Sequence, residues 1–126
     1  MQLNFYRKLD ISDGQVIWLV NPTRTFQKNF SSNVPRHCTV LYKYKNVPVD
    51  MALLWVDKKT DEEEIAENIA NTIEKTIGNG IIWVLIDFEA KDKEPSILEI
   101  AKSKNLLVSK KLDIYKNIFG IKLVKL

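Results

Sequence analysis

Hydrophobic and polar residues follow two different periods along this chain, and the change of period locates its secondary structure. Val47–Val56 is a long apolar run, which is typical of a strand. Thr60–Ile77 has apolar residues three and four positions apart, which predicts an amphipathic helix. Ile81–Phe88 is apolar at nearly every position and predicts a strand buried on both faces. Together these segments predict a βαβ unit, with two parallel strands and a right-handed crossover.

The helix in this unit has its own start and stop patterns. Thr60 and Glu63 have the spacing of a capping box, and acidic residues fill the first turn, where they favour the positive end of the helix dipole. The segment 78–80, Gly-Asn-Gly, is typical of a helix C-cap. The buried stripe is expected to consist of isoleucines four residues apart, namely Ile65, Ile69, Ile73 and Ile77.

Shorter patterns predict the remaining elements. Alternating or apolar runs predict three further strands, at Leu3–Leu9, Gln15–Val20 and His37–Lys45. Asn46 marks a turn, after which the chain returns as the strand that ends at Asp57. Helices are expected at Pro22–Ser31 and Pro95–Lys104, and a terminal hairpin at Leu106–Ile114 and Ile121–Leu126, around Asn117–Gly120.

Length and composition agree with one α/β domain over residues 1–126. It is expected to contain a mixed sheet, a βαβ unit, two or three helices and a C-terminal hairpin. The 126 residues are 45% hydrophobic and 28% charged, which is ordinary for a globular protein. The longest apolar runs stay well below the ~18 residues that span a bilayer. The first residues do not resemble a signal peptide, so we expect a cytoplasmic location and no membrane contact.

The single cysteine, Cys38, excludes an intrachain disulfide, and Cys38 with His37 is too few ligands for a structural zinc site. These two residues are also poor partners for each other. Neighbours on a strand point to opposite faces, so a Cys–His catalytic pair is not expected here. Cys38 is expected to be a small core residue, and the three tryptophans are expected in the core as well.

Charge is distributed unevenly around a net value of +3. Residues 51–90 carry nine Asp or Glu and three Lys, whereas residues 91–126 carry nine Lys and four Asp or Glu. Residues 1–50 are also basic, with seven Lys or Arg and three Asp. The basic ends therefore leave nucleic acid open as a partner, although nucleic-acid-binding domains more often have a single basic face.

Charged residues follow both strands of the predicted βαβ unit, at the edge where open parallel sheets bind ligands. The candidate binding residues are Asp57, Lys58, Lys59, Asp87, Glu89 and Lys91. On an extended chain the last three would share one face, because side chains alternate. Carboxylates beside lysines suit a divalent cation with a phosphate. The alternative is that these charges are only solvated strand ends.

A second candidate surface interleaves aromatic and cationic residues in the segment Tyr42-Lys43-Tyr44-Lys45. On a strand, both tyrosines would face one way and stack on nucleic-acid bases. Alternatively, the segment is an edge strand on which the lysines prevent unwanted pairing.

From residue 38 onward, the order of elements resembles the GNAT fold of N-acetyltransferases: hairpin, helix, strand, helix, terminal hairpin. That resemblance implies acetyl-CoA binding at a glycine-rich loop of RxxGxG type before the central helix, with the acyl arm along Leu54–Val56. The corresponding segment, 57–61, has neither arginine nor glycine. Two acid-x-Lys triplets, Asp57-Lys58-Lys59 and Glu89-Ala90-Lys91, also resemble half of the PD-(D/E)xK nuclease motif, which implies a bound metal.

These observations favour a small binding or regulatory module that acts by protein–protein contact. We expect no catalytic residues, no resident metal and no cofactor, and the expected partner is another protein. Two alternatives remain open at this point. One is a CoA-dependent N-acyltransferase with a degenerate cofactor loop, and the other is a metal-dependent nuclease or nucleic-acid binder.

Overall fold

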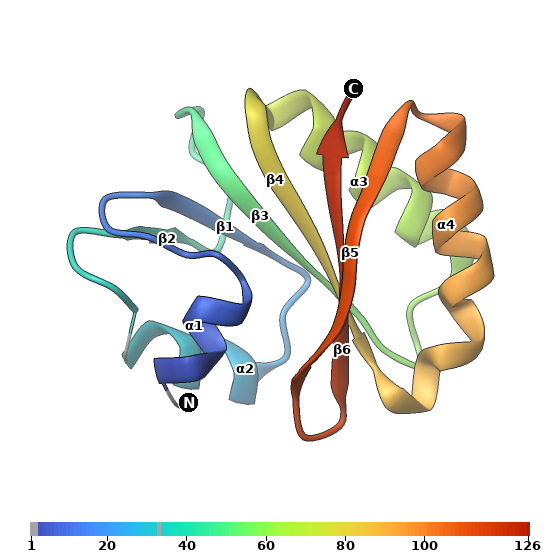
Figure 1. Ribbon diagram of the computed structural model, residues 1–126, viewed down its shortest axis with the longest axis horizontal. Coiled ribbons are helices and arrows are strands. Elements are labelled where there is room, and N and C mark those ends of the chain that lie inside the picture. Colours follow the sequence, from blue (N-terminus) through green and yellow to red (C-terminus); the bar gives the residue numbers. More distant parts are fainter. Residues whose placement is uncertain (1–2, 33) are drawn as a thin grey trace.

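The computed structural model describes residues 3–32 and 34–126, and its strands form one six-stranded sheet with helices on both faces (Figure 1). The strands lie in the order β2-β1-β3-β4-β6-β5. Their bounds are β1 Val16–Val20, β2 Thr39–Leu41, β3 Val49–Val56, β4 Thr76–Asp87, β5 Leu106–Tyr115 and β6 Ile118–Lys125. The helices are α1 Leu3–Lys8, α2 Arg24–Ser32, α3 Glu62–Lys75, the 3₁₀ helix η1 Phe88–Lys93 and α4 Glu94–Ser103.

The sheet is mixed, which confirms the predicted α/β class. Strands β2, β1, β3 and β4 pair in parallel, whereas β6 runs antiparallel to β4 and β5 antiparallel to β6. The predicted βαβ unit is present as β3, α3 and β4, with Leu54 paired to Val84. The helix predictions at α2 and α4 and the terminal hairpin are confirmed as well.

Strand β3 divides its side chains between two apolar cores, because consecutive residues of a strand point to opposite faces. Met51, Leu53 and Trp55 belong to a cluster with the aromatic residues of α1 and α2. Ala52, Leu54 and Val56 belong to a second cluster with α3 and α4. Each of these six side chains is at most 5% exposed, as expected for a central strand covered on both faces.

The connections that leave β1 and β3 go to opposite faces of the sheet. Phe26 and Phe30 of α2 pack on one face, and Ile65 and Ile69 of α3 pack on the other. Figure 1 shows α1 and α2 together at one side of the sheet and α3 and α4 at the other. Since β1 and β3 are neighbours, the strand order reverses between them. Ligands in open α/β sheets bind at the carboxyl end of such a reversal point.

The prediction of a strand at Leu3–Leu9 was wrong, because this segment begins with α1. Phe5, Tyr6 and Leu9 are all buried, and their spacing of three to four residues fits one helical face. The ring of Phe5 contacts Phe26 at a centroid distance of 5.9 Å. Tertiary packing against α2 therefore decides the conformation of a segment too short to indicate its own.

The strand predicted at His37–Lys45 is reduced to the three residues of β2, and it does not form a hairpin with β3. It pairs in parallel with β1 instead, with Ile17 opposite Val40. His37 and Asn46 both have positive φ, at 60° and 59°, which bends the chain out of extended geometry on either side of β2.

The ends of α3 also differ from the prediction. Its N-cap is Asp61, whose Oδ1 accepts a hydrogen bond from the Glu64 N–H, so Thr60 does not form the expected capping box. The helix ends at Thr76 in an extended conformation, and residues 78–80 belong to β4 instead of forming a C-cap. The Thr76 hydroxyl donates to the Thr72 carbonyl at 2.7 Å, which satisfies one carbonyl of the last turn.

Gly120 of β6 lies where the sheet has no room for a side chain. A Cβ at this position would lie 2.9 Å from Ile114 Cγ1 and 3.0 Å from Trp83 Cε3. Trp83 is fully buried, and its indole N–H donates to the Leu9 carbonyl at 2.9 Å, so the ring cannot shift without breaking this bond.

We expect the substitution Gly120→Ala to lower the free energy of unfolding by about 1–3 kcal/mol, because overpacking displaces buried atoms. Urea denaturation monitored by tryptophan fluorescence measures this. Gly78→Ala is the matched control, since a Cβ there has no atom within 4 Å. Equal stabilities for the two variants would contradict the tight contact at Trp83.

Tyr6 joins α1 to α2 through a hydrogen bond from its hydroxyl to the Phe30 carbonyl, at 2.9 Å. Burial raises the pKa of the Tyr6 phenol above its ordinary value.

We expect the substitution Tyr6→Phe to lower the free energy of unfolding by about 1 kcal/mol at neutral pH, because this hydrogen bond is lost. Above a pH of about 10 the unfolded chain releases this proton before the folded chain does, so wild-type stability falls. The difference in free energy of unfolding between wild type and Tyr6→Phe should therefore become smaller above this pH, as measured by urea denaturation at a series of pH values. A difference that grows with pH would contradict the raised pKa.

Candidate functional site

The carboxyl ends of β3 and β4 meet at one edge of the sheet, where two neighbouring clefts share the side chain of Asp87. One cleft has a volume of about 270 Å³ and is lined by Asp57, Lys58, Lys59, Asp87 and Glu89. The other has a volume of about 320 Å³ and is lined by Thr23, Thr25, Phe26, Asn29, Trp55, Asp87, Tyr115 and Ile118. We call the two together the carboxyl-edge cleft.

Two aspartates that end the central strands present carboxylate oxygens at this cleft. Asp57 Oδ1 accepts from the Lys59 N–H at 2.9 Å and from the Thr60 hydroxyl at 3.1 Å. Asp87 Oδ1 accepts from the Glu89 N–H at 2.9 Å. Within residues 3–32 and 34–126, the Oδ2 atom of each aspartate makes no hydrogen bond or ion pair. Both carboxylates are therefore held in place through one oxygen, Oδ1.

Lys93 of η1 holds the loop between β3 and α3 in place by hydrogen bonds. The Lys93 ammonium donates to the Lys58 carbonyl at 3.0 Å and also to the Thr60 carbonyl. Thr60 itself is buried, and its hydroxyl oxygen accepts from the Asp57 N–H at 3.1 Å. These bonds fix the loop that carries the side chains of Lys58 and Lys59 into solvent.

Trp55 forms part of the wall on the α2 side of the cleft. Its ring lies 5.0 Å from the ring of Phe26, and the residue is 5% exposed. The indole N–H is buried and has no hydrogen-bond acceptor in the part of the chain that the structure describes. A buried donor without a partner is uncommon in folded proteins, because leaving it unsatisfied lowers the stability of the fold.

The turn between β1 and α2 lies on the same side of the cleft and contains no glycine. Asn21 takes a positive φ of 57°, and Pro22 has no backbone N–H to offer. The Thr23 hydroxyl accepts from the Phe26 N–H at 3.1 Å, so a further donor of the helix start is already occupied. This turn therefore offers fewer free backbone N–H groups than the glycine-rich turns that hold phosphates at helix starts.

The structure brings five of the six residues predicted for the strand edge into one cleft, Lys91 being the exception. Because η1 begins at Phe88, the chain stops alternating there, and Lys91 lines a different groove, with Phe88. The residues Lys58, Lys59 and Glu89 are exposed, whereas Asp57 and Asp87 are half-buried. Their role in binding stays a prediction.

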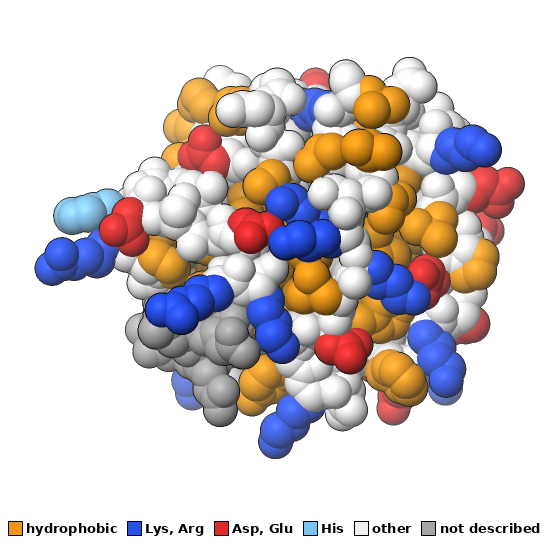
Figure 2. Space-filling model, viewed as in Figure 1, with side chains coloured by type: hydrophobic (Ala, Val, Ile, Leu, Met, Phe, Trp, Pro, Cys, Tyr) orange, Lys and Arg blue, Asp and Glu red, His pale blue; other side chains and the backbone are white. Residues whose placement is uncertain are grey.

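The interleaved segment Tyr42–Lys45 does not form the expected strand. Tyr44 packs against Trp18, with ring centroids 5.6 Å apart, and the Lys75 ammonium lies 4.7 Å above its ring. Tyr42 is 44% exposed and lines a different hollow, with Arg24. The two tyrosines therefore do not share one stacking surface. On the face shown in Figure 2, basic and acidic side chains are interspersed, without a single basic patch.

Sequence reasoning missed the residues that α2 and the terminal hairpin bring to the cleft, which include Thr23, Asn29 and Tyr115. Trp55 was correctly predicted to be buried, but nothing in its apolar strand indicated that it borders a cavity. No spacing in the sequence links these positions, because they converge only through the order of the strands.

The described residues contain neither a metal-binding cluster nor a membrane-spanning helix. Outside positions 1–2 and 33, no group of three or more His, Cys, Asp or Glu side chains is arranged to hold a metal ion. In the same part of the chain, no helix is long and apolar enough to cross a membrane.

The fold of this chain is similar to those of several solved methyltransferases. A ribosomal protein L11 methylase from Lactobacillus delbrueckii subsp. bulgaricus is 8% identical, with a TM-score of 0.61 over 96% of this chain and 74% of the other. A candidate methyltransferase of Streptococcus mutans, solved in complex with SAH, is 9% identical, with a TM-score of 0.65 over 100% and 99%. TrmN from Thermus thermophilus is 12% identical, with a TM-score of 0.67 over 97% and 47%. No family model and no curated protein sequence matches the chain.

These matches correct two predictions, although at such low identity they show the fold alone. The GNAT-like fold was wrong, because the structural neighbours are SAM-dependent methyltransferases and other methylases. The prediction of a binding or regulatory module that acts by protein–protein contact is contradicted as well, since the structural neighbours are methyltransferases. The acyltransferase and nuclease alternatives fit these neighbours no better.

The hydrogen bonds from Lys93 to the loop between β3 and α3 are expected to contribute measurably to stability. We expect Lys93→Met to lower the free energy of unfolding by about 1–3 kcal/mol, since two carbonyls lose a charged donor. Lys91→Met is the matched control, because Lys91 is exposed and donates to no carbonyl in the described ranges. Urea denaturation of both variants measures the difference. An equal decrease in the free energy of unfolding for the two variants would argue against a stabilising role of the Lys93 hydrogen bonds.

Proposed function

We propose that this protein is a methyltransferase that binds S-adenosyl methionine in the carboxyl-edge cleft, around Asp87. The observation that carries the proposal is the position of this cleft. It lies at the carboxyl ends of the central parallel strands, next to the reversal of strand order, in a sheet of the methyltransferase type. The proposal keeps the predicted cytoplasmic location.

The donor set of the cleft suits the charges of that cofactor. S-adenosyl methionine carries a sulfonium cation, an ammonium group and a ribose diol, all of which favour carboxylate partners. Asp57 and Asp87 supply oxygens without a protein partner, and Glu89 adds a third carboxylate. Lys58 and Lys59 would pair with the cofactor carboxylate, and the ring of Trp55 offers an apolar wall for the flat base.

One departure from nucleotide-binding α/β sheets limits where the cofactor would lie. Such sheets commonly use a glycine-rich first turn and an acidic residue after the second strand. Here the first turn is Asn21-Pro22-Thr23, and Tyr42 follows β2. The proposed position is therefore displaced from the β1–α2 turn toward the ends of β3 and β4. When bound, the cofactor would supply an electrophilic methyl group.

Isothermal titration with S-adenosyl methionine and with SAH tests this function directly. We expect saturable binding to the wild-type protein and affinity about tenfold lower in Asp87→Asn, because a charged partner is lost. Asparagine keeps the Oδ1 atom that accepts from the Glu89 N–H, so the local structure is preserved.

Asp113→Asn is the control, since Asp113 lies outside the carboxyl-edge cleft and lines another groove. Its affinity for both ligands should equal that of the wild type. An absence of binding to the wild-type protein would refute the proposal, and so would equal binding by the Asp87→Asn variant.

A further inference from the structure

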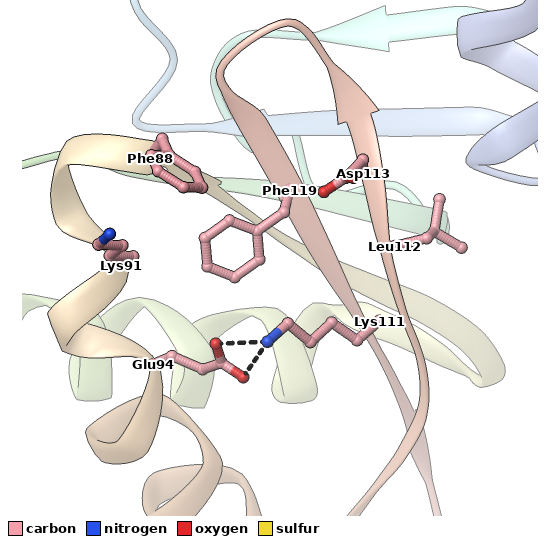
Figure 3. Close-up of a pocket in the computed structure, with 7 residues that line it drawn as sticks. All are labelled: Phe88, Lys91, Glu94, Lys111, Leu112, Asp113 and Phe119. Carbon is pink, nitrogen blue, oxygen red and sulfur yellow. Dashed lines mark hydrogen bonds and ion pairs between the residues drawn. The ribbon is translucent and has the colours of Figure 1, made fainter.

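A second hollow lies on the other side of the end of β4, between the start of α4 and the terminal hairpin (Figure 3). We call it the hairpin groove. Its volume is about 390 Å³, which is within the range that holds a small organic ligand. It is lined by Phe88, Lys91, Glu94, Lys111, Leu112, Asp113 and Phe119.

Two aromatic rings give the hairpin groove an apolar surface. Phe119 is 5% exposed and forms part of the core, whereas Phe88 is 54% exposed. Covering the exposed ring of Phe88 with a flat apolar group is favourable, because it removes apolar surface from water. Phe88 is the first residue of η1, and its N–H donates to the Asn117 carbonyl of the hairpin turn at 2.7 Å. Its backbone position is thereby fixed.

A lysine ammonium lies beside each ring. Lys91 Nζ is 4.7 Å from the centroid of Phe88, and Lys111 Nζ is 5.2 Å from the centroid of Phe119. The charge of Lys111 is already balanced, because Glu94 binds it through both carboxylate oxygens at 2.7 and 2.8 Å. Lys91 forms no ion pair anywhere in the described residues. Lys91 is therefore the cation of this groove that remains available to an anion.

The remaining acid of the groove lies apart from Lys91. In Figure 3, Asp113 and Lys91 lie on opposite sides of the Phe119 ring. A ligand with its anionic group at the Lys91 end and its apolar body over the rings would therefore match the local charges. The groove favours one orientation of such a ligand.

We propose that the hairpin groove binds a small planar aromatic carboxylate, with its ring against Phe88 and Phe119 and its carboxylate paired with Lys91. This site does not depend on methyl transfer, because no residue of the carboxyl-edge cleft contributes to its lining. Its ligand can be bound in the absence of any cofactor.

Titration with 2-naphthoate, followed by NMR chemical shifts of the protein, tests this site. We expect saturable binding, with affinity lowered about tenfold in Lys91→Met through loss of the charged partner. Methionine retains the apolar contact with the Phe88 ring, so the groove keeps its shape. Phe88→Ala should lower affinity about fivefold through lost ring contact. Naphthalene-2-carboxamide, the uncharged analogue, should bind about as weakly to wild type as the carboxylate binds to Lys91→Met.

Two control variants make the result specific to this groove. Lys59→Met removes another exposed lysine, from the carboxyl-edge cleft, and should leave the affinity for 2-naphthoate unchanged. Asp87→Asn should also leave it unchanged, which separates this test from that of S-adenosyl methionine. The proposal is overturned if wild type shows no saturable binding, if Lys91→Met binds as tightly as wild type, or if the carboxamide binds as tightly as the carboxylate.

Discussion

Parallel pairing on both sides of β3 is the constraint on which the rest of this structure depends. Its backbone is hydrogen-bonded to β1 on one side and β4 on the other, with Leu54 opposite both Val20 and Val84. A strand in this position has no face toward solvent, so its alternating side chains fill two separate cores. Because both cores are apolar, β3 and β4 carry charged residues only near their ends, and their parallel direction places Asp57 and Asp87 at the same edge.

The end of β4 shows how one strand end serves two different sites. Asp87 closes the strand and lines the carboxyl-edge cleft on the side of β3 and α2. The next residue, Phe88, begins a 3₁₀ helix and lines the hairpin groove instead. The change from strand to helix between these residues turns consecutive side chains toward separate hollows. The carboxyl-edge cleft and the hairpin groove thus lie next to each other without shared lining residues.

At the carboxyl edge, side chains form hydrogen bonds with backbone groups of the neighbouring loops. Thr23 occupies a donor at the start of α2, and Asp61 does so at the start of α3. Lys93 occupies the carbonyls of the loop between β3 and α3. Some backbone groups at this edge are therefore already bonded within the protein, whereas carboxylate and lysine side chains line the cleft beside Asp87. This is the physical reason for placing a ligand beside Asp87 and not over the first turn.

Local periodicity in the sequence was sufficient for α3, α4, the terminal hairpin and the β3–α3–β4 unit, because each has a long apolar pattern of its own. It also placed Asp57, Lys58, Lys59, Asp87 and Glu89 at one edge, since parallel strands end together. It failed at α1 and β2, which are short and take their conformation from α2 and β1. It failed again at the fold family, because a GNAT-like and a methyltransferase-like order of elements look alike along the chain. Strand order depends on contacts between residues far apart in sequence, and only the tertiary structure decided which side chains from α2 and the hairpin meet Asp87.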